Sequence, residues 1–218
     1  MGILLKKKMI MIIIIIVAIS ITVGTVAIYF LNRLGVFFDP GNRYPSTNLN
    51  YMGVLFEDES DINAFNEGYS ESASCPWGFE HNGIDYFFNN GTNVLAASPG
   101  QVWEIEKHQG EGENTYHVRI WIRFNSSVNI GYNFEPWTSI ELKREQQISM
   151  FKVEVGDWVE KGDIIAEFLQ CNVSAHIHFD IIENGGRYCP TKYFDSTGFA
   201  QIMNLIHSYH PTWNLCYP

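Results

Sequence analysis

Basic residues are scarce in this sequence. Lysine and arginine together number 14, against 24 aspartates and glutamates, so the formal net charge is −10 at pH 7. Proteins that bind nucleic acid need a basic surface to neutralise phosphates. The shortage of basic residues argues against a nucleic-acid partner. An acidic, solvated surface is the simplest interpretation of the net charge.

Charge is absent altogether from a long N-terminal stretch. Three lysines at positions 6–8 precede a mainly apolar run at residues 9–31, and the next charged residue is Arg33. A run of this length can span a bilayer as one helix, whereas the apolar part of a cleaved signal peptide is usually only about 7–15 residues long. We therefore expect an uncleaved, single-pass anchor in the cell membrane. By the positive-inside rule, residues 1–8 lie in the cytoplasm and the C-terminal domain lies outside.

Cysteine is also sparse, and the chain contains no Cys-x-x-Cys pair, which argues against a cysteine-based zinc site. Its four cysteines are Cys75, Cys171, Cys189 and Cys216. In an exported domain they favour disulfides, and three pairings are open. We prefer Cys189 with Cys216, which would pin the C-terminal tail. The other pair would be Cys75 with Cys171, since each lies a few residues upstream of a segment discussed below.

Helical periodicity is nearly absent beyond the apolar run. Residues 32–50 are rich in Gly, Pro, Asn, Ser and Thr and predict a stalk, which leaves 51–218 as the folded domain. Apolar and polar residues alternate at 117–124, and turn signals recur at strand-length intervals, as expected for a sheet. Helical spacing is confined to residues 196–208, with Ser196 as a candidate N-cap. We expect a mainly β domain, an antiparallel sheet or sandwich with a short C-terminal helix.

One predicted strand, at residues 175–181, carries two imidazoles. Because side chains alternate along a strand, His176, His178 and Asp180 share one face, and the apolar residues between them share the other. Imidazole is both a common zinc ligand and the side chain that titrates near neutral pH. The two histidines are therefore either neighbouring ligands or one ligand beside one proton-transfer group.

A second informative stretch is His-Asn-Gly-Ile-Asp at residues 81–85. In an extended conformation His81, Gly83 and Asp85 point the same way, and the glycine removes a side chain that would crowd a bound ion. With His178, the histidine and aspartate supply three N/O ligands and leave a fourth position for water, as in catalytic zinc sites. Such an ion lowers the pKa of water and polarises a carbonyl.

Five short motifs occur in order along the chain, at residues 81–85, 91–96, 100–102, 155–163 and 176–180. Together they resemble the M23 family of zinc metallopeptidases, which includes lysostaphin, over about residues 77–194. The resemblance implies a small antiparallel β domain with a groove and zinc held by His81, Asp85 and His178. It also implies proton transfer by His176 and hydrolysis of peptide bonds in cell-wall peptides.

The sequence differs from the family in one motif. Its second catalytic histidine lies in a Tyr-x-His stretch, and the best match is Tyr132-Asn133-Phe134, which puts Phe134 in the place of that histidine, followed by Glu135. Three functions follow as hypotheses. The first is a membrane-anchored zinc endopeptidase acting outside the cell on a peptidoglycan-like polymer. The second is a catalytically impaired zinc- or peptide-binding adaptor or regulator.

The third hypothesis comes from a different class of protein. Sugar-transport phosphocarrier domains of the glucose-permease type share a related fold and a similar His-x-Gly-Ile-Asp stretch. They work in the cytoplasm, whereas Lys6, Lys7 and Lys8 are expected to place this domain outside. This hypothesis therefore ranks last.

Overall fold

The structure is a computed structural model that describes residues 20, 24 and 49–218. The chain divides into two compact units, Met1–Phe38 and Asp39–Pro218. The predicted stub at 1–8, the predicted membrane helix at 9–31 apart from residues 20 and 24, and nearly all of the stalk at 32–50 lie outside the described residues and stay predictions. Among the residues that are described, no helix is long and apolar enough to cross a membrane.

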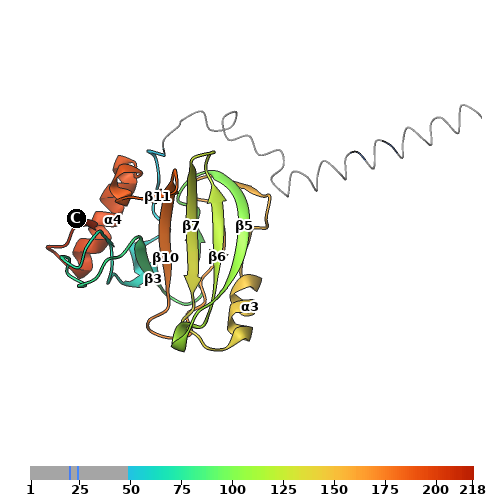
Figure 1. The fold of residues 1–218 in the computed structure, drawn as a ribbon, viewed down its shortest axis with the longest axis horizontal. Helices are drawn as coiled ribbons and strands as arrows, with labels where there is room; N and C mark the ends of the chain where they lie inside the picture. Colours follow the sequence, from blue (N-terminus) through green and yellow to red (C-terminus); the bar gives the residue numbers. More distant parts are fainter. Residues whose placement is uncertain (1–19, 21–23, 25–48) are drawn as a thin grey trace, which may run out of the picture. The chain divides into compact units, whose positions relative to one another are not determined.

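An antiparallel sheet forms the centre of the described domain (Figure 1). Within residues 49–218 it has eight strands in the order β1-β3-β10-β7-β6-β5-β8, with β11 paired to β10. Two small pairs lie off this sheet, β4 with β9 and β12 with β2. The strand bounds are β1 Ile62–Ala64, β2 Tyr69–Ser70, β3 Ile84–Phe88, β4 Asn93–Leu95, β5 Gly100–Gln109, β6 Tyr116–Arg123, β7 Val128–Glu135, β8 Trp158–Val159, β9 Ile164–Glu167, β10 His176–Glu183, β11 Gly186–Arg187 and β12 Cys216–Tyr217.

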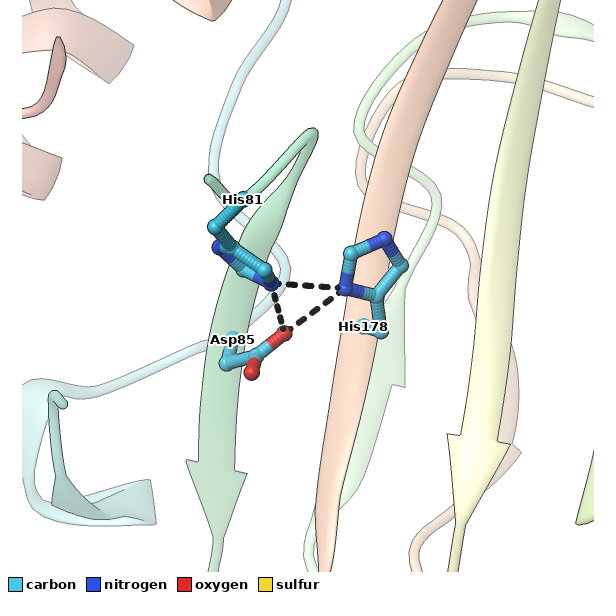
Figure 2. A group of neighbouring side chains, drawn as sticks. All are labelled: His81, Asp85 and His178. Carbon is cyan, nitrogen blue, oxygen red and sulfur yellow. Dashed lines mark hydrogen bonds and ion pairs between the residues drawn. The ribbon is translucent and has the colours of Figure 1, made fainter. Parts of the chain in front are cut away.

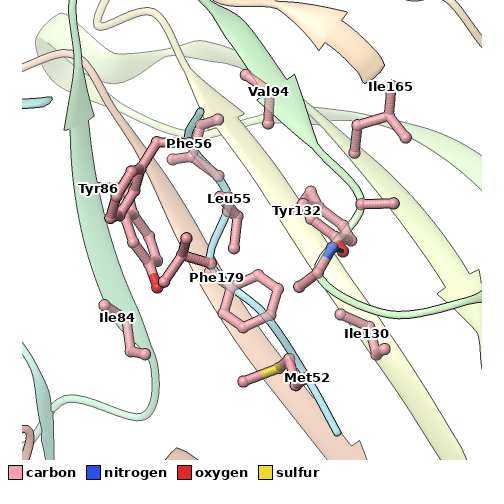
Figure 3. Close-up of a cluster of buried hydrophobic side chains, with 14 of the residues drawn as sticks. Met52, Leu55, Phe56, Ile84, Tyr86, Val94, Ile130, Tyr132, Ile165 and Phe179 are labelled. Carbon is pink, nitrogen blue, oxygen red and sulfur yellow. Dashed lines mark hydrogen bonds between the residues drawn. The ribbon is translucent and has the colours of Figure 1, made fainter. Parts of the chain in front are cut away.

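Side-chain alternation decides which face of the sheet is buried. In β6, Val118, Ile120 and Ile122 are fully buried and their neighbours are partly exposed, which confirms the predicted alternation. The buried face packs on the extended segment at 49–56, as Figure 3 shows for Met52 and Leu55. The opposite face of the sheet is left to carry polar groups.

Within residues 49–218, two helices and three short 3-10 turns complete the fold. The helices are α3 Glu141–Ser149 and α4 Ser196–Tyr209, and the turns are Glu59–Asp61, Gly112–Asn114 and Pro190–Lys192. The C-terminal helix is present as predicted, but its N-cap is Asp195, whose carboxylate accepts a 2.7 Å bond from the Gly198 amide, and not Ser196. Helix α3 is not predicted by the sequence pattern because it has no apolar stripe. It is held instead by Gln147, whose side chain bonds the backbone of Glu167 and Leu169.

The cysteines follow the predicted pairing only in part. Cys189 and Cys216 form a disulfide, as expected. Cys75 and Cys171 are both free, so the second predicted disulfide is wrong. Each has its own hydrogen bond: the Cys75 thiol bonds the nearby Phe79 carbonyl, and the Cys171 amide bonds the Pro136 carbonyl, which is distant in sequence.

Candidate metal centre

Two neighbouring strands bring the predicted ligands together. Asp85 in β3 and His178 in β10 are directly paired across the antiparallel ladder. Residues opposite one another in such a pair share a face with their Cβ atoms about 4.5–5.5 Å apart. His81 lies just before β3, four residues ahead of Asp85, and its ring reaches the same point (Figure 2).

The three side chains fit a zinc ion. His178 Nδ1 lies 2.9 Å from Asp85 Oδ1 and 3.0 Å from His81 Nε2, and the third side of the triangle, His81 Nε2 to Asp85 Oδ1, is 3.3 Å. Tetrahedral zinc with bonds of about 2.0–2.1 Å needs ligand atoms about 3.3 Å apart. The triangle is within a few tenths of an ångström of that size, and its two imidazoles and one carboxylate are ordinary zinc donors.

Neighbouring groups orient the two imidazoles. His81 Nδ1 lies 2.7 Å from the Gly68 carbonyl. A carbonyl only accepts, so Nδ1 carries the proton and Nε2 of the neutral ring keeps a free lone pair for a metal. A Cβ on Gly83 would lie 2.6 Å from His178 Cε1. Glycine is therefore needed here, though the atoms it makes room for belong to the ligand's ring and not to the ion itself.

Neighbouring charges shift the pKa values of the buried groups in the site. Burial disfavours a charged His81, but the hydrogen bond and charge of Asp85 outweigh it and raise the pKa of His81 to about 9. Burial would raise the pKa of Asp85, yet the facing histidines, His176 first, hold it well below its usual range. The proton that the raised pKa keeps on His81 near neutral pH must leave when a metal binds there, so metal binding and proton release are linked.

His176 lies on the same face but does not join the ligand triangle. Its Nδ1 donates to the Ser174 carbonyl at 2.8 Å, and its Nε2 is 3.5 Å from both Asp85 Oδ2 and Glu135 Oε2. Burial opposes the charged ring, but these carboxylates prevail and raise the pKa of His176. The ring packs near Trp137, whose backbone has a positive φ of 59°. Such a conformation is uncommon outside glycine and often marks a functional site.

The residue across from His176 is Glu135. The sequence predicts Phe134 at that place, and this prediction is wrong. The register of β7 against β10 pairs Glu135 with His176 and Phe134 with Ile177. Phe134 is fully buried and packs on Phe151 at a ring distance of 5.0 Å, on the core side of the sheet. The period-2 pattern of β7 could have revealed this, because its buried Ile-x-Tyr-x-Phe series requires the alternate residues, including the glutamate, to face the site.

A second carboxyl, Glu67, was not predicted at all. It lines the same groove of about 430 Å³ as His81 and His176. Burial, followed by a hydrogen bond with Asp85, raises the pKa of Glu67 to about 7. It precedes β2 in an irregular segment, where no periodicity or motif singles it out.

The remaining histidines have structural roles away from the ligand triangle. His117 bonds Asn133 and stacks on His108 at a ring distance of 5.0 Å. His207 and His210 bond backbone carbonyls of residues 213 and 65. Asp180, on the site face of β10, is paired with Arg187 at 2.7 Å and takes no part in the triangle.

Comparisons with known proteins give structural matches only. No family model and no curated protein matches the chain. Among solved structures, a zinc-containing peptidase from Vibrio cholerae is 18% identical, with a TM-score of 0.45, over 65% of this chain and 40% of that one. Lysostaphin, an antimicrobial peptidase from Staphylococcus simulans, is 20% identical, with a TM-score of 0.42, over 68% of this chain and 56% of that one.

A third match is the catalytic domain, in a mutant form, of the prophage-encoded M23 protein EnpA from Enterococcus faecalis. It is 20% identical, with a TM-score of 0.44, over 65% of this chain and 97% of that one. The matched region spans less than two thirds of the V. cholerae and lysostaphin chains. These three matches, a zinc-containing peptidase, lysostaphin and an M23 protein, are likenesses of structure. Independently of them, the described domain carries a candidate metal site of two histidines and one aspartate.

Proposed function

We propose that this chain is a membrane-anchored zinc endopeptidase that cleaves peptide bonds of a cell-envelope polymer outside the cell. The observation that supports it most is the ligand triangle of His81, Asp85 and His178 beside a histidine–carboxylate pair in one groove. The anchor and the location rest on the uncharged run at residues 9–31 and the lysines before it. The envelope substrate rests on the motif resemblance described above.

In this proposal the three ligands hold zinc. A zinc ion, when bound, polarises a carbonyl and lowers the pKa of water towards 7. His176 directs its Nε2 into the groove, since its Nδ1 is committed to the Ser174 carbonyl, so it can pass a proton to or from a bound peptide. Glu135 faces that nitrogen, and its carboxylate is fixed by amide donors from Asn114 and Asn133. It is placed to accept a proton or to stabilise the imidazolium.

The test uses the full-length chain in detergent, loaded with zinc, on isolated cell-wall preparations and on oligoglycine peptides. His178→Ala should lose both metal and cleavage. His176→Ala should keep one zinc per chain by elemental analysis and lose cleavage, and Glu135→Gln should keep zinc with kcat lowered about 10²–10⁴-fold. Lys107→Ala, which removes an exposed ion pair with Glu145 away from the groove, is the control and should be unaffected. Full activity in His176→Ala would overturn the mechanism.

A second function, a zinc- or peptide-binding adaptor, is favoured by one observation. An ionised carboxylate only accepts hydrogen bonds, so Glu135 cannot donate to a developing oxyanion. Loss of such a donor costs about 2.7–4 kcal/mol of barrier. One zinc per chain with no cleavage of any wall preparation would establish this second function and exclude the first.

A further inference from the structure

His81 is held differently from the other two ligands. Asp85 and His178 lie inside paired strands of the main sheet, whereas His81 precedes β3 and makes a single bridge to Ser70. The two backbones exchange bonds of 2.7 and 3.0 Å, and the Ser70 hydroxyl accepts a further bond from the His81 amide at 2.9 Å. With the bond from its ring to the Gly68 carbonyl, His81 takes its position from residues 68–70.

Residues 68–70 are in turn held by the C-terminal end of the chain. Strand β2 pairs with β12 in parallel, and the Tyr69 amide donates to the Leu215 carbonyl at 3.0 Å. Gly68 approaches so closely that a Cβ there would lie 2.5 Å from the same carbonyl oxygen. Each of these strands is only two residues long. A two-stranded pair of this size is not stable by itself, so something else must hold β12 in place.

Besides the burial of the neighbouring Leu215 in the core, two contacts fasten β12. The disulfide joins Cys216 to Cys189, which follows β11, the partner of the His178 strand. On the other side, Trp77 packs on Trp213 and Tyr217 at ring distances of 5.6 and 5.2 Å. Its indole nitrogen donates to the Ser70 hydroxyl at 3.0 Å. The chain end is therefore tied both to the segment after β11, which pairs with the strand that carries His178, and to Ser70, which positions His81.

We infer that the C-terminal segment at 213–217, fastened by the Cys189–Cys216 disulfide, is the positioning element of the metal ligand His81. The inference rests on the metal site of the proposed function. Without the disulfide, β12 loses its covalent tie, residues 68–70 lose their partner, and the His81 ring loses its fixed orientation. Asp85 and His178 stay paired within the sheet, so the domain stays folded with a weakened site. Loss of an orienting group around a metal ligand typically weakens binding about 10–100-fold.

The experiment compares zinc affinity in the full-length chain and in the Cys189→Ser/Cys216→Ser variant, by competition with a chromophoric chelator. Both carry Cys75→Ser and Cys171→Ser, so that no free thiol outside the disulfide binds metal. Zinc Kd should rise about 10–100-fold. The cobalt-substituted variant should lose intensity in its visible absorption bands, because one nitrogen ligand is no longer fixed. Ser70→Ala, with the disulfide intact, should shift both readouts in the same direction.

A stability control separates positioning from general weakening. Asp195→Ala removes the cap of α4 without touching β2, β12 or the ligands, so it should lower stability and leave zinc Kd unchanged. A Kd within twofold of the parent in both the double-serine and Ser70→Ala variants would overturn the inference while leaving the proposed function intact. A parent chain that binds no zinc would overturn the proposed function, and the inference with it.

Discussion

At the scale of single residues, Gly83 lets the chain just before β3 approach the His178 ring on β10. A Cβ at this position would lie 2.6 Å from His178 Cε1 and 2.7 Å from the Phe179 carbonyl oxygen. We expect Gly83→Ala to displace the His178 ring, weaken zinc binding at least about tenfold and lower the free energy of unfolding by about 1–3 kcal/mol. Zinc titration and urea unfolding measure the two effects.

A matched glycine serves as the control for this prediction. A Cβ on Gly53 would make only an ordinary 3.4 Å contact with the flexible Lys161 side chain. Gly53→Ala should change neither quantity. Equal zinc affinity in Gly83→Ala and the parent protein would contradict the predicted displacement of the His178 ring.

The two faces of β7 give opposite outcomes for adjacent substitutions. Phe134→His puts a polar ring into the core beside Phe151, so it should lower the free energy of unfolding by about 2–4 kcal/mol and bring no gain in cleavage. Glu135→His puts the imidazole opposite His176, where it can donate a hydrogen bond. Its kcat on wall peptides should exceed that of Phe134→His, with zinc content equal in the two. Higher activity in Phe134→His than in Glu135→His would contradict the observed register of β7 against β10.

At the scale of elements, the N-cap of α4 provides a pH-dependent test. The amide of Gly198, followed by the Lys161 side chain, holds the pKa of Asp195 below its usual value. A lowered pKa in the folded state means that the stabilisation is complete above pH of about 4 and is lost as the pH falls through the lowered pKa. Asp195→Ala should therefore cost about 0.5–2 kcal/mol at pH 7, with a smaller difference at pH of about 3.

Ser196→Ala is the matched control for the cap. Its side chain makes no capping bond, so urea unfolding should give a change below about 0.5 kcal/mol at either pH. A larger loss from Ser196→Ala than from Asp195→Ala would restore the cap position expected from the sequence. A pH-independent difference between Asp195→Ala and the parent would contradict a charged cap.

At the scale of the whole molecule, zinc binding should raise the stability of the folded state. A ligand that binds only the folded state adds RT ln(1 + [L]/Kd), about 4 kcal/mol at 1,000 times Kd. Zinc should raise the Tm of the chelator-treated protein, and His178→Ala should abolish the shift. Magnesium should produce none, because it prefers oxygen ligands in octahedral geometry. Scanning fluorimetry with each metal measures this, and an equal shift from magnesium would contradict the nitrogen-rich site.

The sequence by itself determined the candidate ligands and the β class. Both follow from local periodicity: alternation places His178 and Asp85 on defined faces of their strands, and the alternating run of β6 can bury only one side. The same rule, applied to β7, predicts that Glu135 lies on the face of the sheet that carries the site. Helix α3 could not be predicted from the sequence pattern, because a polar residue, Gln147, anchors it to backbone groups that are distant in sequence.

The tertiary structure alone decided how distant segments meet. Glu67, in an irregular segment, enters the groove because its carbonyl accepts a backbone bond from Asp85 of β3. The free cysteines lie in bends whose separation no local pattern encodes. The support of His81 through β2, β12 and the disulfide joins residues far apart in the chain. Periodicity acts over neighbouring residues, whereas such contacts depend on loop paths, so the sequence specified the candidate ligands and only the fold revealed what holds them.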